Sequence, residues 1–321
     1  MPDTVETFDI IRPTDHRLIS RGIDCVLSGA EILPHSNSGD LAARRRSFDE
    51  HCLKHGVDTS RQVLAMQAQL IVGACLWVGT AGRTAMFYAP GNIAPDQQLR
   101  QAQVRCVAEA CRDAAAARMV VGQAILTPET LAVAALYRAA DFFELATLLY
   151  MRRGLPWRKP SFELPPDFQL VSYTPDRRAD FGCAIEASYH QTLDCPRLTG
   201  MRSMEDVLAG HQAVAFDPSL WLLLLRDAQP VGVLLMAQRE ENAPLELVYL
   251  GLAPQCRGMG LGGQLIQLVL QTAMRVRAAG ITLAVDRANT PAVHLYNRFR
   301  FEQIAQRQVL IRPLENPPHH D

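Results

Sequence analysis

The alternation of apolar and polar positions divides the chain into two halves with a similar order of elements. Period-two alternation predicts strands, and apolar residues spaced three and four apart predict helices. In the first half we expect strands at Phe8–Arg12, Gln62–Ala68, Leu70–Val78, Arg83–Ala89, Met119–Leu126 and Ala146–Arg152, and helices at Pro95–Ala117 and Glu129–Ala140. In the second half we expect strands at Pro166–Tyr173, Leu220–Arg226, Val231–Gln238, Glu246–Leu252, Ile281–Asp286 and Gln308–Arg312, and helices at Arg178–His190, from Leu261, and at Pro291–Phe299. The fold class is therefore α/β, with a mixed sheet in each half.

The two halves align at one predicted helix. Leu136-Tyr137 and Leu295-Tyr296 are each followed by a phenylalanine five residues after the tyrosine. A repeat of this kind predicts two domains in tandem, as does the chain length of 321 residues. The proline-rich segment 154–166 predicts a stiff linker. We therefore place one domain at residues 1–153 and the other at residues 167–321.

A strand that ends in a glycine-rich turn is the main chemical signal. The strand Glu246–Leu252 is stopped by Pro254, and the turn Gln255–Gly263 then opens an apolar helix. Glycines let a ligand approach the backbone, and the free N–H groups of the first helical turn favour an anion. Arg257 would add a fork of donors. The ligand expected at this turn is a diphosphate.

Two of the three diphosphate-binding patterns fit poorly. A P-loop requires Lys followed by Ser or Thr after its glycines, and neither pair is present. The run Gly258-Met259-Gly260-Leu261-Gly262-Gly263 does fit GxGxxG letter by letter. A dinucleotide-binding sheet needs more strands after that motif than remain here.

The third pattern is that of the GNAT superfamily of N-acetyltransferases, which the second half resembles. Gln255-x-x-Gly258-x-Gly260 matches the family's acetyl-CoA pyrophosphate signature, and Asn289-x-x-Ala292-x-x-x-Tyr296 matches its later helix motif. The strands Glu246–Leu252 and Ile281–Asp286 resemble its fourth and fifth strands. Arg300 departs from the glycine that usually precedes the phenylalanine, so we expect an altered turn there. The first half lacks the glycine turn and has Thr130 in place of Asn289.

The resemblance implies two tandem GNAT-like domains, of which the N-terminal one is degenerate. The C-terminal domain would bind acetyl-CoA as co-substrate, and Gly251 would let its strand splay from the neighbouring one. The cofactor-binding residues that the resemblance implies are Leu250, Gly251, Leu252, Arg257, Gly258, Met259, Gly260, Leu261, Gly262, Gly263 and Asn289. For Asn289 a simple helix cap is the alternative interpretation.

Direct acetyl transfer to an amine needs a base for the amine, donors for the oxyanion and an acid for the leaving thiolate. Tyr296 resembles the family's general acid, although a tyrosine that only packs under the sheet is the alternative. Glu246 is the candidate base, because it alternates onto the face of Leu250 and Leu252. Its spacing to Pro254 also resembles the base-bearing strand of the mycothiol synthases, which are tandem GNAT proteins with one degenerate half. A solvated carboxylate at the strand end is the alternative.

Substrate contacts are expected from the helix that starts at Arg178 and from the loop after it. Glu186 or Asp194 would hold a cationic amine, and Tyr189 or Trp221 would line its pocket. The first three are equally plausible as surface positions, and Trp221 as hairpin core.

Composition and charge exclude several classes of partner. The net charge of −1 gives no electrostatic basis for binding nucleic acid or an anionic membrane. No apolar run reaches the ~18 residues of a membrane span, and the segment MPDTVETFDIIRP does not read as a signal peptide. The eight cysteines form no CxxC pair, so we expect no metal site and free thiols in a reducing cytoplasm.

The function expected from these observations is N-acetylation of a small-molecule primary amine, with no nucleic-acid or membrane partner and with the oligomeric state left open. One alternative is a non-catalytic protein that senses acetyl-CoA or serves as a scaffold. Another is transfer of a longer acyl group, or transfer to a protein N-terminus.

Overall fold

The computed structural model describes residues 8–28, 40–91 and 93–314 of the chain. The prediction that the chain starts without a signal peptide used residues 1–13. Residues 1–7 of that segment lie outside the described residues. Contacts divide the chain into two compact units. Unit 1 comprises residues 1–145 and 308–321, and unit 2 comprises residues 146–307.

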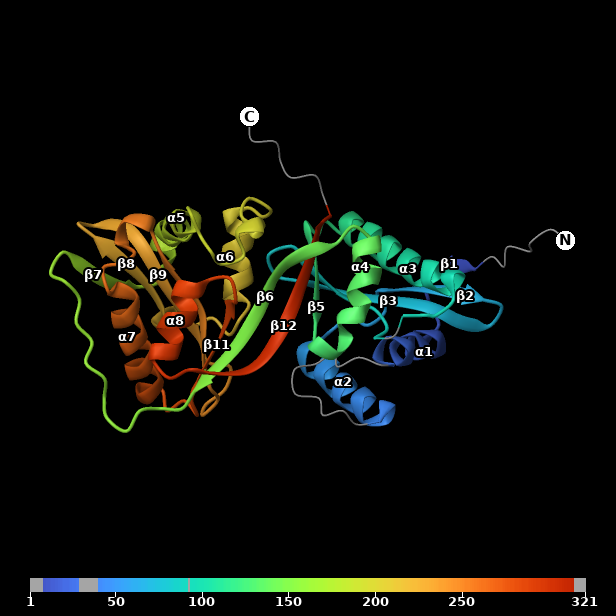
Figure 1. Cartoon of the computed structure of the whole chain (residues 1–321), viewed down its shortest axis with the longest axis horizontal. Helices are drawn as coiled ribbons and strands as arrows, with labels where there is room; N and C mark the ends of the chain where they lie inside the picture. The colour runs from blue at the N-terminus through green and yellow to red at the C-terminus, as the bar shows by residue number, and fades with distance from the viewer. Residues whose placement is uncertain (1–7, 29–39, 92, 315–321) are drawn as a thin grey trace, which may run out of the picture. The chain divides into compact units, whose positions relative to one another are not determined.

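Unit 1 is a mixed sheet covered by helices (Figure 1). Its strands are β1 (Asp9–Ile11), β2 (Gln62–Gln67), β3 (Leu70–Thr80), β4 (Thr84–Tyr88), β5 (Val121–Leu126) and the second half of β12 (Glu302–Pro313), in that spatial order. Its helices are α1 (His16–Leu27), α2 (Leu41–His55), α3 (Gln97–Ala116) and α4 (Ala134–Ala139), the last preceded by a 3₁₀ turn at Pro128–Val133. Only β4 and β5 run parallel; the other neighbours within unit 1 are antiparallel.

Unit 2 repeats this plan. Its strands, in spatial order, are β6 (Phe143–Arg153), β11 (Ile281–Asp286), β10 (Leu245–Leu252), β9 (Gln229–Ala237), β8 (Trp221–Arg226) and β7 (Phe168–Ser172). Its helices are α5 (Arg178–Tyr189), α6 (Met204–Gln212), α7 (Leu261–Arg275) and α8 (Thr290–Arg298). One apolar core packs β10 and β11 against α7 and α8, and a second packs the other face of the sheet against α5 and α6.

The two units exchange a strand. Residues 148–153 of β6, which follow unit 1 in the chain, pair with β11 of unit 2. Residues 308–313 of β12, which follow unit 2, pair with β5 of unit 1. The sequence had placed each of these strands with the half that precedes it, because the pattern of a strand shows that one face is buried but does not name its partner.

Most predicted elements are present in the structure; helices α1 and α2 had no predicted bounds, and two further helices differ from expectation. The element expected at Glu129–Ala140 is a 3₁₀ turn followed by the short α4. Helix α6 was not predicted, because it has only nine residues and buries only Val207 and Leu208. Such a short apolar stripe falls below what periodicity detects.

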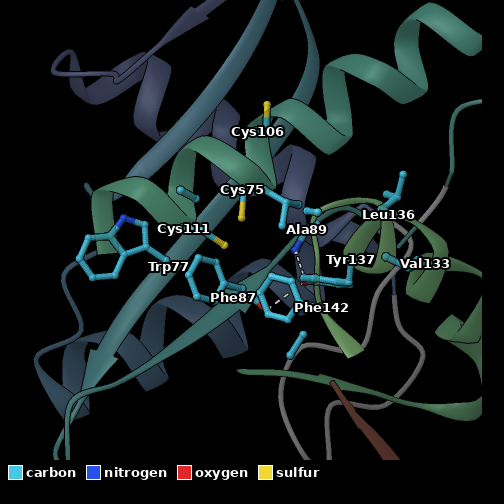
Figure 2. Packing of buried hydrophobic residues seen from close by; sticks show 14 of the residues in the cluster. Cys75, Trp77, Phe87, Ala89, Cys106, Cys111, Val133, Leu136, Tyr137 and Phe142 are labelled. Carbon is cyan, nitrogen blue, oxygen red and sulfur yellow. Dashed lines mark hydrogen bonds between the residues drawn. The ribbon is translucent and has the colours of Figure 1, made fainter. Parts of the chain in front are cut away.

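Figure 2 shows the core of unit 1 around Tyr137 of α4. The Tyr137 hydroxyl accepts a hydrogen bond from Ala89 N–H (3.0 Å) and donates one to Phe87 O (3.0 Å). Phe87 and Ala89 lie where β4 ends, beyond the last residue that pairs with β5, which is Met86. The tyrosine therefore satisfies the backbone polar groups exposed where the two parallel strands part.

Candidate functional site

Strands β10 and β11 of unit 2 part in the same way, and here the gap leads to the glycine turn. They pair in parallel only at Leu245–Leu247 with Ile281–Leu283. A register irregularity between Leu247 and Tyr249 marks a β-bulge in β10. Beyond it, β10 continues to Leu252 beside β9 alone. Its N–H and C=O groups on the β11 side, apart from Leu252 O, which accepts from Arg257 Nε, are thus available to an extended ligand.

The glycine turn presents unpaired N–H groups at the start of α7. Gly258 and Gly260 have φ of 74° and 81°, and a Cβ added to either would meet no heavy atom within 4 Å. Within the described residues, no N–H from Gly258 to Gly262 donates to a backbone carbonyl. Gly260 caps α7 without a side chain, so the helix N-terminus is open to an anion. A cavity of about 340 Å³ lies here, lined by Met259, Gly260, Leu261, Gln264 and residues 163–166.

Arg257 occupies a different position from the one expected. Its guanidinium donates to three backbone carbonyls, those of Leu252 (3.0 Å), Gln191 (3.1 Å) and Ser188 (2.8 Å). These bonds tie the end of β10 to the end of α5 and to the loop that follows. The geometry gives Arg257 a positioning role, and its role as a phosphate donor stays a prediction.

Tyr296 of α8 is the counterpart of Tyr137, and its hydroxyl is differently placed. The residue is 8% exposed and packs against Phe301 at 5.7 Å between ring centroids. No hydrogen bond joins its hydroxyl to another residue in the described parts of the chain. Burial raises the pKa of Tyr296, and the charge of Asp194 raises it further. The phenol therefore keeps its proton at neutral pH.

The loop after α5 is fastened to the end of β11 by a reciprocal pair of hydrogen bonds. Asp286 N–H donates to Asp194 Oδ1 (3.2 Å), and Cys195 N–H donates to Asp286 Oδ2 (3.2 Å). Burial raises the pKa of Asp194, and the charge of Asp286 adds to this effect while its N–H opposes it. A carboxylate of raised pKa thus lies within electrostatic reach of Tyr296.

An aromatic cluster lines the α5–α6 side of the gap. The Tyr249 and Ser188 hydroxyls are 2.7 Å apart, and the rings of Tyr189 and His211 lie 6.3 and 5.4 Å from that of Tyr249. Burial and the charge of Arg202 lower the pKa of His211 to about 4, so the imidazole is neutral at pH 7. Arg202 Nε is buried and has no hydrogen-bond partner among the described residues.

Sequence reasoning found Tyr189 and Asp194 of this region and missed Tyr249, His211 and Arg202. The alternation along β10 marked Tyr249 only as an ordinary strand residue. His211 and Arg202 lie on or just before α6, the helix that periodicity did not detect.

The bulge corrects the expectation for Glu246. Leu245 and Leu247 pack in the same core as Leu250 and Leu252, so Glu246, between the first two, points to the opposite face. The extra residue at the bulge shifts the alternation that the sequence implied. The Glu246 side chain is 41% exposed, and its nearest cationic partner is Arg239 at 3.9 Å.

Other predicted residues have structural explanations. A Cβ at Gly251 would lie 2.6 Å from Ser188 Oγ, so close packing of α5 on β10 requires the glycine, and its role in the splay of the strand stays a prediction. Asn289 caps α8 by accepting from Ala292 N–H (3.4 Å). Trp221 is fully buried in hairpin core, and Glu186 is exposed on α5 outside the aromatic cluster.

Comparison with known proteins shows what this region resembles. The acetyltransferase (GNAT) family matches residues 186–301. A mycothiol acetyltransferase of Acidothermus cellulolyticus is 32% identical over 53% of this chain and 55% of its own length. Another, of Thermobispora bispora, is 34% identical over 47% of this chain and 52% of its own length. The chain spans about half the length of the curated relatives it matches.

Solved structures resemble the chain over nearly its whole length. A GCN5-related N-acetyltransferase of Sphaerobacter thermophilus has a TM-score of 0.59 at 16% identity and covers 96% of both chains. A tandem GNAT protein from the clavulanic acid biosynthesis pathway has a TM-score of 0.50 at 14% identity and covers 97% of this chain and 99% of its own. These likenesses establish the tandem GNAT fold. Among the described helices, none has the length and apolarity to cross a lipid bilayer.

Proposed function

We propose that unit 2, whose residues 186–301 match the acetyltransferase (GNAT) family, transfers an acetyl group from acetyl-CoA to a primary amine of a small molecule. Relatives named mycothiol acetyltransferases favour a small-molecule acceptor. The buried Arg202 Nε, which lacks a partner in the described chain, favours an acceptor that carries a carboxylate or a similar hydrogen-bond acceptor near its amine.

The described residues fit acetyl-CoA. The free N–H groups at Gly258–Gly262 would hold its diphosphate, with the dipole of α7 behind them. The unpaired edge of β10 at Leu250–Leu252 would hold the pantetheine as an added strand and donate to the thioester carbonyl. Bound acetyl-CoA supplies the activated acyl group.

The observation that carries the proposal is the contrast between Tyr296 and Tyr137. The Tyr137 hydroxyl is used up by the backbone of its own unit, whereas that of Tyr296 has no partner in the described chain. A phenol of raised pKa beside the gap is suited to donate its proton to the departing thiolate.

Two carboxylates compete for the role of base. Glu246 lies on the α5–α6 face of the sheet, where an acceptor would approach, but it is largely solvated. Asp194 is partly buried and acts electrostatically on Tyr296 and Tyr249, and its raised pKa brings it closer to that of an effective base. We propose that one of the two takes the proton of the amine.

Thiol release from acetyl-CoA with a panel of primary amines tests these roles. Tyr296→Phe should reduce kcat by about 100-fold or more with unchanged acetyl-CoA affinity by calorimetry. Asp194→Asn and Glu246→Gln are compared in the same assay, and the true base is the one whose replacement lowers kcat and removes the acid limb of the pH profile. Full turnover in Tyr296→Phe would contradict the acid assignment. Acetyl-CoA binding without turnover on any amine would favour the sensing function.

A further inference from the structure

Half of the residues that line a second cavity of unit 2 carry a positive charge. The cavity has a volume of about 320 Å³ and lies between the proline-rich segment after β6, the middle of α7 and the end of α8. Its charged lining consists of Arg153, Arg158, Lys159, Arg298 and Arg300. None of the residues of the glycine turn belongs to it.

No carboxylate balances these five charges. The cavity lining contains no acidic residue. In the part of the chain that the structure describes, no ion pair joins any of the five cations to Asp or Glu; Arg153 donates instead to Phe299 O. Burial and the like charge of Arg300 lower the pKa of Arg153. Five uncompensated cations around one cavity repel each other, and a bound anion would relieve that repulsion.

The backbone at Arg300 supports a specific use for this charge. Arg300 has φ of 60°, in the left-handed region that costs an ordinary residue energy and that glycine adopts freely. The chain nonetheless places an arginine there, and its side chain lines the cavity. The matching residue of unit 1, Asp141, has φ of 63°, so this conformation belongs to the helix end in both units, and what is particular to unit 2 is the cation placed there.

Two further features indicate what sort of anion fits. Arg298 reaches the first turn of α7, since a Cβ on Gly263 would lie 3.1 Å from its Nη2, so the cavity adjoins the diphosphate turn. Trp157, which precedes Arg158 in the chain and is not part of the cavity lining, is wholly exposed. Arginine forks suit phosphate oxygens, and an exposed indole suits a base.

We propose that this cavity binds a phosphate monoester, separately from the diphosphate turn. One source of the ester is the 3′-phosphate of coenzyme A held at that turn, and this source rests on the proposed function. The other source is a second phosphorylated molecule, which is independent of the proposed function. In both cases the residues that bind it come from the proline-rich segment and from the end of α8.

The test compares coenzyme A with 3′-dephospho-coenzyme A by calorimetry, and adds adenosine 3′,5′-bisphosphate as a free probe with Trp157 emission as a second readout. Trp77 and Trp221 are buried, so Trp157 should dominate any ligand-induced change. The variants are Arg300→Gly and the double variant Arg298→Gln/Arg300→Gln. The control is Arg275→Gln/Arg277→Gln, which removes two exposed charges outside the cavity.

Two results support the proposal. Coenzyme A binds the wild type about 10-fold or more tighter than its dephospho form, and the difference disappears in both cavity variants. In the second supporting result, coenzyme A and its dephospho form bind equally, and adenosine 3′,5′-bisphosphate binds protein that is already saturated with coenzyme A. This binding of the bisphosphate is lost in both cavity variants. Arg300→Gly should melt no lower than the wild type, because it relieves the positive φ, so a binding loss there is not a folding defect.

Other results separate the two proposals. Bisphosphate binding that depends on Arg298 and Arg300, with no binding of coenzyme A, would leave this site standing and remove the proposed acetyltransferase function. Equal binding of both coenzyme forms together with no binding of the bisphosphate would overturn the site. Equal losses in the Arg275→Gln/Arg277→Gln control would overturn it as well.

Discussion

At the scale of single residues, the two halves differ most in what their matching tyrosines contact. The Tyr137 hydroxyl bonds the backbone at the end of β4 in unit 1, whereas the Tyr296 hydroxyl of unit 2 has no hydrogen-bond partner in the described chain. The sequence aligned these residues correctly. It could not distinguish them, because the same motif produces both positions and only the path of the neighbouring strand decides where the hydroxyl bonds.

Replacing Tyr137 by Phe should lower the free energy of unfolding by about 1–3 kcal/mol, because Ala89 N–H and Phe87 O would lose a buried partner. Chemical denaturation followed by circular dichroism measures this. Acetyl transfer by unit 2 should be unchanged in the folded variant. An undiminished unfolding free energy would show that water or a backbone shift replaces the hydroxyl.

His211 should make stability depend on pH. Its pKa is lowered from 6.5 to about 4 by burial and by Arg202, so between these values the unfolded state binds more protons than the folded one. The free energy of unfolding is therefore highest above pH 6.5 and falls as the pH drops towards 4, by up to about 3 kcal/mol from this residue. The raised pKa of Asp194 acts in the opposite sense.

Denaturation at several pH values tests this prediction with His211→Gln, which should flatten the dependence. The matched control is His294→Gln at an exposed position of α8, which should leave the slope as in the wild type. A slope that His211→Gln does not change would show that the imidazole titrates normally.

At the scale of elements, periodicity predicted nearly every strand, but the bulge in β10 and the hydrogen bonds of Arg257 were beyond it. A bulge has no composition of its own, since Val248 is an ordinary strand residue. In the sequence, an arginine beside glycines resembles a phosphate donor. In the structure, the fold brings the carbonyls of Ser188 and Gln191 next to Arg257, and its guanidinium donates to them. Both depend on tertiary contacts.

The position of Arg257 leads to a prediction that separates its two roles. If it fastens α5 and the following loop to β10, Arg257→Ala should lower kcat through the Asp194 loop and leave acetyl-CoA affinity nearly unchanged. If it is a phosphate donor, acetyl-CoA affinity should fall by about 10-fold or more. Calorimetry and steady-state kinetics on the same variant decide between them. Gln264→Ala, at the cavity beside the turn, is the comparison.

At the scale of the whole molecule, the strand exchange makes unit 1 depend on a distant part of the chain, because residues 308–313 follow the whole of unit 2. Val309, Leu310 and Ile311 of β12 are at most 1% exposed, and Leu310 belongs to the core of unit 1. The sequence predicted these strands and the repeat. It did not predict the exchange, because both strands have the same pattern and offer antiparallel edges to equivalent partners.

Truncation after Arg307 should therefore unfold unit 1, although residues 1–145 would be intact. Hydrogen exchange should show lost protection in β5, whose partner would be missing, while β9 and β10 of unit 2 stay protected. Adding the peptide 308–314 in trans should restore part of the protection. A truncated chain with fully protected β5 would show that unit 1 is stable without the exchanged strand.

The exchange also sets the timing of folding during synthesis. When β5 leaves the ribosome, its partner is still roughly 180 residues away, which at ribosomal speeds of ~5–20 residues per second is a wait of about 9–36 s. Through that interval the edge of β5 is exposed in the nascent chain, and chaperones have time to bind it. A gene cut within the segment 154–166 would leave unit 1 without β12 and unit 2 without β6, so each unit would lack a strand of its sheet.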